Sequence, residues 1–182
     1  MKNIYVVGKD EVDLELVQEY LKHMDLLNDL ANWTQFANYD MLPSLIKLRT
    51  LVNKLQPHTD TETILYRGMG LDIKYQNNLS LKPDDKYKNS NFKFKVLLDK
   101  PISFSTNEEI ATDFGSSVIE IKPGKLIPNF LRITPEISWA LASRNKVTAT
   151  SEREWIWIPD KIVTIEARFI KYKKPLLPSW VF

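Results

Sequence analysis

Residues 92–98 read Phe-Lys-Phe-Lys-Val-Leu-Leu, and this alternation of apolar and charged side chains decides the fold class of the surrounding chain. Successive side chains of a β-strand point to opposite faces, so the pattern predicts a half-buried strand with one face in water. Short apolar runs on both sides of it indicate further strands at residues 63–66, 118–121, 155–158 and 162–170. We therefore expect the chain after Pro57 to be rich in strands, interrupted by one short helix at residues 108–114.

Before Pro57 the apolar residues follow a helical period, three or four positions apart, which predicts three amphipathic helices. Their apolar faces are Leu14, Val17, Leu21 and Met24; then Leu26, Leu30, Trp33 and Ala37; then Leu45, Leu48, Val52 and Leu55. Asp10 is the expected N-cap of the first helix, and Pro43 and Pro57 bracket the third. A helical part (1–57) packed on a strand-rich part (58–182) predicts an α+β fold, because the strands come in a run instead of alternating with helices.

The composition sets limits on domain count and partners. A chain of 182 residues with 43% hydrophobic and 26% charged residues is expected to form a single domain, residues 1–182, that buries its own core. The formal net charge of +2 gives little reason to expect a nucleic acid or an anionic membrane as partner, and a monomer is the default expectation. The four apolar residues at 4–7 are too few for a signal peptide, and no later stretch is long enough to span a bilayer, so we expect a cytoplasmic location.

The residue inventory also limits the chemistry. The absence of cysteine removes disulfides, thiolate catalysis and thiolate metal ligation together. The two histidines, His23 and His58, lack the spacing of metal ligands, so no metal site is expected. Catalysis by this chain would have to rely on carboxylates, hydroxyls and guanidinium groups.

Two short polar motifs of the strand-rich part lie next to predicted turns. In Leu65-Tyr66-Arg67-Gly68, an arginine ends a predicted strand where Gly68 and Gly70 allow the chain to turn. Its planar guanidinium can bind two phosphate oxygens at once. The alternative is a surface arginine before a turn, which would show the same sequence. Residues 102–107, Ile-Ser-Phe-Ser-Thr-Asn, precede the short helix and fit simple helix capping. The functional alternative is that Ser105 points into a cleft and orients polar groups there.

The third motif is Ser151-Glu152-Arg153-Glu154, which opens the apolar run Trp-Ile-Trp-Ile. In a strand Glu152 and Glu154 share a face, about 7 Å apart along the chain. Two carboxylates on one face repel each other, and such pairs are more often kept for chemistry than for folding. A solvated strand edge is the alternative reading.

Taken together, Arg-Gly, Ser-Thr before a helix and Glu-x-Glu opening a strand resemble the arginine-specific mono-ADP-ribosyltransferases of the R–S–E class. This family includes clostridial binary toxins and small phage enzymes that modify host proteins, and the size of the chain is most similar to the phage members. The resemblance covers roughly residues 64–165 and departs from the Ser-Thr-Ser pattern at Asn107. It implies a two-sheet β core of the ADP-ribosyltransferase type, NAD as the substrate that donates ADP-ribose, and an arginine of a target protein, expected to be a host protein, as acceptor.

The resemblance also implies a role for each matching residue. Glu154 would accept a hydrogen bond from the ribose 2′-hydroxyl and stabilise an oxocarbenium-like ring. Glu152 would bind the acceptor guanidinium and help to remove its proton. Arg67 would hold the pyrophosphate or the adjacent ribose, and Ser105 would fix the rotamer of Glu154. Three further residues, Gly68, Thr106 and Phe114, would complete the NAD site. Residues 144–151 correspond to the family's substrate-recognition loop, and Phe130 and Arg132 are assigned to a loop closing over nicotinamide.

Other functions share parts of this pattern. The acceptor could be a nucleic acid, or it could be water, which would make the protein an NAD glycohydrolase. A non-catalytic interaction module, with coincidental or decayed motifs, would not bind NAD at all.

Overall fold

The computed structural model describes residues 4–7, 10–36, 39–69, 73–75, 79–81, 93–115, 117–144 and 154–172. Its N-terminal helices match the three expected from the helical period: α1 (Leu14–Leu21), α2 (Met24–Phe36) and α3 (Leu42–Leu55), the last preceded by the 3-10 turn η1 (Tyr39–Met41). Pro43 lies in the first turn of α3, as expected of a residue that lacks a backbone N–H.

The predicted N-cap of α1 was wrong. The cap is Asp13, whose carboxylate accepts hydrogen bonds from the backbone N–H groups of Glu15 at 3.0 Å and Leu16 at 3.4 Å. Asp10 is instead the first residue of strand β2 (Asp10–Asp13), which pairs with β1 (Ile4–Val7) in a separate two-stranded sheet. An N-cap has to lie directly before the first helical residue, and β2 occupies the positions between Asp10 and the helix.

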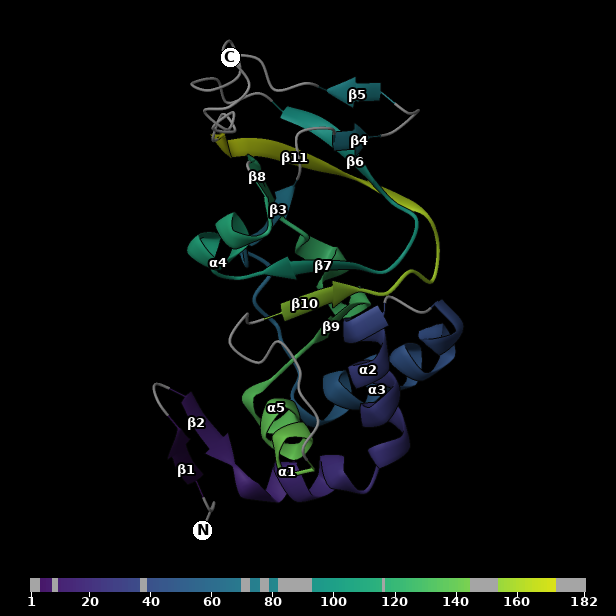
Figure 1. Ribbon diagram of the computed structural model, residues 1–182, viewed down its shortest axis with the longest axis vertical. Coiled ribbons are helices and arrows are strands. Elements are labelled where there is room, and N and C mark those ends of the chain that lie inside the picture. Colours follow the sequence, from purple (N-terminus) through teal and green to yellow (C-terminus); the bar gives the residue numbers. More distant parts are fainter. Residues whose placement is uncertain are drawn as a thin grey trace, which may run out of the picture.

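Seven strands form one antiparallel sheet in the order β6-β11-β8-β3-β7-β10-β9 (Figure 1). Their bounds are β3 Leu65–Met69, β6 Lys93–Leu98, β7 Ile102–Ser105, β8 Ser117–Ile121, β9 Phe130–Arg132, β10 Glu154–Trp157 and β11 Val163–Tyr172. The remaining elements are the small β4 (Ile73–Tyr75) and β5 (Leu79–Leu81) pair, α4 (Glu108–Asp113), η4 (Gly124–Asn129) and α5 (Pro135–Ala142). The α+β prediction is confirmed, and β6 shows the expected alternation of exposed and buried side chains.

The seven-stranded sheet has a weak join near its middle. Between β3 and β7, whose residues are all described, a single register pair forms, Tyr66 with Ser105. By comparison, β3 pairs with β8 at five positions and β10 pairs with β7 at four. The sheet therefore divides into a four-stranded part, β6-β11-β8-β3, and a three-stranded part, β7-β10-β9.

The helical part packs on the three-stranded part (Figure 1). Alternate residues of β10 enter different cores: Ile156 packs with the helices, whereas Trp155 and Trp157 pack among the strands. Because β10 is buried on both faces, the three residues after Glu154 are all apolar and do not alternate with polar ones. Glu154 lies two residues before Ile156 and therefore faces the helical side of the sheet.

The assignment of Phe130 and Arg132 to a loop over nicotinamide was wrong. Both belong to β9, and Phe130 is fully buried against the rings of Phe104 and Trp157. Arg132 donates a hydrogen bond to the backbone carbonyl of Gln56, beyond the end of α3. Arg132 thus ties the helical part to the sheet, Phe130 belongs to the core among the strands, and neither residue lies in a loop.

Candidate active site

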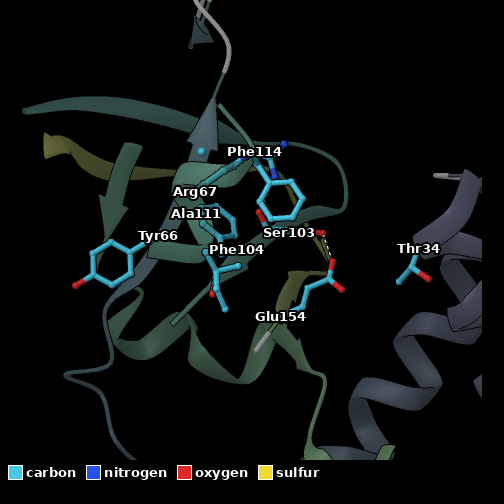
Figure 2. Close-up of a pocket in the computed structure, with 11 residues that line it drawn as sticks. Thr34, Tyr66, Arg67, Ser103, Phe104, Ala111, Phe114 and Glu154 are labelled. Carbon is cyan, nitrogen blue, oxygen red and sulfur yellow. Dashed lines mark hydrogen bonds between the residues drawn. The ribbon is translucent and has the colours of Figure 1, made fainter. Parts of the chain in front are cut away.

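A cavity of about 370 Å³ opens at the join between the two parts of the sheet. It is lined by residues from β3, β7, α4, β10 and α2 (Figure 2): Thr34, Tyr66, Arg67, Gly68, Ser103, Phe104, Ser105, Ile110, Ala111, Phe114 and Glu154. Its volume lies within the range of about 300–1,000 Å³ that is usual for small-molecule sites.

Glu154 is a buried carboxylate on the wall of this cavity, with 7% of its surface exposed. It opens β10, where it lies opposite Ser105 of β7, and the pairing of Ile156 with Ser103 brings Ser103 to the same face. The Ser103 hydroxyl donates a hydrogen bond to Glu154 Oε1 (Figure 2). We expected a hydroxyl contact to Glu154 from Ser105, and the structure shows one from Ser103, the residue two positions earlier.

Arg67 supplies a partly buried positive charge to the same cavity from β3. Its Nη1 donates to the backbone carbonyl of Ser103 at 2.6 Å. Burial lowers the pKa of the Arg67 guanidinium, and the negative charge of Glu154 acts in the opposite direction. A guanidinium has five N–H donors, and toward the described residues Arg67 forms this one hydrogen bond. The cavity therefore presents a partly desolvated cation suited to a bound anion.

The helix α4 forms another wall of the cavity and is held very close to β3. Its N-cap is Asn107, whose side chain accepts from the Glu109 backbone N–H at 2.9 Å, while Ser105 Oγ accepts from the Asn107 backbone N–H at 3.0 Å. A Cβ added at Gly68 would lie 1.9 Å from the carbonyl oxygen of Ala111 in α4. Glycine is therefore required at position 68 by the approach of two backbones, independently of any ligand.

The structure brings together most of the site residues predicted from the sequence. Arg67, Gly68, Ser105, Phe114 and Glu154 all line the one cavity, and Phe114 is 58% exposed there. The described lining does not include Thr106, the residue that follows β7. Glu152 and residues 145–151 lie outside the described residues.

Some lining residues were missed by the sequence reasoning. Ser103 could have been found, because residues two apart on a strand share a face and Ser105 was already singled out. Thr34 carries no such signal. It reaches the cavity from α2, and only the packing of the helices on the sheet brings it there.

Among the residues that the structure describes, no group of three or more His, Asp or Glu side chains is placed to hold a metal ion. In the same residues, no helix has the length and apolar character needed to cross a bilayer.

Comparisons with protein-family models, with curated proteins and with solved structures gave no match for this chain. Function has to be inferred from the geometry and chemistry of the cavity, together with the motif resemblance.

Proposed function

We propose that the chain is a mono-ADP-ribosyltransferase, which cleaves NAD and transfers ADP-ribose to an arginine of another protein. The observation that carries the proposal is the meeting of Arg67 and Glu154 in one cavity, connected through Ser103. Arg67 comes from the four-stranded part of the sheet and Glu154 from the three-stranded part. A partly buried cation and a buried carboxylate on one cavity suit a substrate with an anionic pyrophosphate and a carbon that becomes positive.

Each wall of the cavity has a place in this proposal. The Arg67 guanidinium would bind the NAD pyrophosphate, because its fork matches two phosphate oxygens. The exposed ring of Phe114 would stack on the flat nicotinamide. The join between the four- and three-stranded parts would be the counterpart of the two-sheet core of the ADP-ribosyltransferases, with NAD bound across it.

The reaction substitutes one nitrogen for another at C1′ of the nicotinamide ribose. The bond from C1′ to the nicotinamide nitrogen breaks, and its electron pair leaves with neutral nicotinamide. A guanidinium nitrogen of the acceptor forms the new bond to C1′ and loses one proton, which passes through a carboxylate to water. Because C1′ gains positive charge before the new bond is complete, Glu154 lowers the barrier electrostatically, by about 3–4 kcal/mol.

Arginine as acceptor needs a second carboxylate. The pKa of a guanidinium lies above 12, so the group attacks only if a partner removes its proton. Glu152 stays the prediction for this role, on the strength of the Glu-x-Glu motif.

The direct test is incubation of the protein with a cell lysate and NAD labelled on its adenylate phosphate. We expect label on protein that resists nuclease, with the modified arginine located by mass spectrometry. Glu154→Gln should lower the rate about a hundredfold to a thousandfold. Glu166→Gln is the matched control, because Glu166 is an exposed carboxylate on β11.

Three results would contradict the proposal, each favouring another function. Label removed by ribonuclease would indicate a nucleic-acid acceptor, and free ADP-ribose as sole product would indicate a glycohydrolase. Calorimetry that shows no heat of NAD binding with the wild type as well as with Arg67→Ala would indicate a non-catalytic module.

A further inference from the structure

The side of the cavity opposite Arg67 is formed by helix α2. Thr34 of α2 lines the cavity, and in the view of Figure 2 Glu154 lies between Thr34 on one side and Arg67 and Phe114 on the other. The helical part thus supplies a wall of the candidate site and does more than cover the sheet.

The groups on this side offer hydrogen-bond acceptors. The Thr34 hydroxyl donates its one proton to the backbone carbonyl of Ala31 at 2.9 Å, so its oxygen faces other groups as an acceptor. Thr34 lies in the last turn of α2, which ends at Phe36. The last four carbonyls of a helix have no partner within it and carry partial negative charge. No basic residue in that turn offsets this charge.

The carboxylate of Glu154 faces the same space from β10. A carboxylate, a threonine oxygen and the negative end of a helix together repel a phosphate and attract a cation that carries several N–H donors. Arg67, at the other side of Glu154, has the opposite preference. The cavity is therefore divided by charge into a part for anions and a part for cations.

We infer that the space between Thr34 and Glu154 is the subsite for the acceptor guanidinium, with Thr34 as a specificity-determining residue. The inference rests on the proposed function and adds to it the place from which the acceptor enters. Displacement at C1′ requires the acceptor to approach from the side away from the departing nicotinamide. With nicotinamide against Phe114, that side is the one formed by α2.

The experiment uses agmatine as a small guanidinium acceptor and measures KM for agmatine and KM for NAD separately. Thr34→Val keeps the shape of the side chain but removes its oxygen. We expect the ratio of KM for agmatine to KM for NAD to rise about tenfold, the effect of one hydrogen bond to a charged group. Thr34→Ser retains the oxygen and should keep the ratio near that of the wild type.

Thr50→Val is the matched control for the loss of a helical threonine. Thr50 lies in α3 and donates to the Ile46 carbonyl at 3.0 Å, but it is exposed and does not line the cavity. This variant should leave the ratio unchanged.

The possible failures are distinguishable. A Thr34→Val variant that raises KM for NAD as much as KM for agmatine, or changes neither, overturns the subsite and leaves the proposed function standing. A wild type that hydrolyses NAD but does not modify agmatine overturns the subsite together with the arginine acceptor. A wild type that does not bind NAD overturns the proposed function itself.

Discussion

Replacing Gly68 by alanine tests the closest packing contact of the candidate site. The new Cβ would lie 1.9 Å from the Ala111 carbonyl oxygen and 3.0 Å from the Gly115 backbone nitrogen. Both are main-chain atoms, so no side-chain rotation relieves the contact. Helix α4 would have to retreat from β3 by about 1 Å, and such overpacking costs about 3 kcal/mol. For a domain of this size, the loss corresponds to a fall in Tm of about 6–12 °C.

Urea denaturation of Gly68→Ala, followed by tryptophan fluorescence, measures the free energy of unfolding directly. Gly124→Ala is an informative control, because position 124 has φ of +55° and nothing within 4 Å of an added Cβ. Its expected loss of about 1–2 kcal/mol comes from backbone strain alone. The close approach of α4 and β3 is refuted if Gly68→Ala is no less stable than Gly124→Ala.

Three further changes probe one contact of the cavity and two contacts elsewhere in the fold. Ser103→Ala should lower kcat for NAD cleavage about tenfold more than it raises KM, because Glu154 loses the hydroxyl that orients it. Ser103→Thr should restore the rate, and equal changes in kcat and KM would contradict this role. Arg49→Met should destabilise the fold by about 2 kcal/mol, since the Arg49 guanidinium bonds the Ile158 carbonyl at 2.7 Å and Asp160 at 2.8 Å, and denaturant titration would show it. Burial and the positive charge of Arg132 lower the pKa of the His58 imidazole below its usual 6.5. Near that pH the unfolded chain therefore binds more protons than the folded one. The free energy of unfolding should therefore fall as pH drops through 6.5 toward 5, and His58→Gln should flatten that slope; an unchanged slope would exclude the role of His58.

The elements predicted correctly are those with a polar and an apolar face. The helices α2 and α3 and the strand β6 each have one buried and one wet side, so their period is visible in the sequence. The helix α5 was missed, because Ile137, Ala140 and Leu141 are fully buried and Trp139 is also apolar, which leaves little polar face to reveal a period. The three-residue strand β9 was missed as well, since so short a run has no period of its own.

The candidate site was predictable where its chemistry is concentrated in short segments. Arg67 and Glu154 were found because each stands in an unusual local context, an arginine beside glycine and a carboxylate before an apolar strand. The strand period places Ser103 on the same face as Ser105, but its hydrogen bond to Glu154 depends on the register of β7 and β10, which no local pattern specifies. Thr34 depends on how a helix docks on a sheet, and tertiary packing of this kind has no signature in a single sequence.

The single register pair between β3 and β7 has a consequence for ligand-dependent stability. Arg67 and Glu154 lie on opposite sides of that pair, so a molecule that binds both acts as a non-covalent cross-link between the two parts of the sheet. Such a ligand, at a hundred times its Kd, raises the free energy of unfolding by about 2.7 kcal/mol. Backbone amides of β3 and β7 would then exchange more slowly with deuterium than in the ligand-free protein. The weakest line of the sheet is thus also the place where a ligand bound in the cavity would add most to its rigidity.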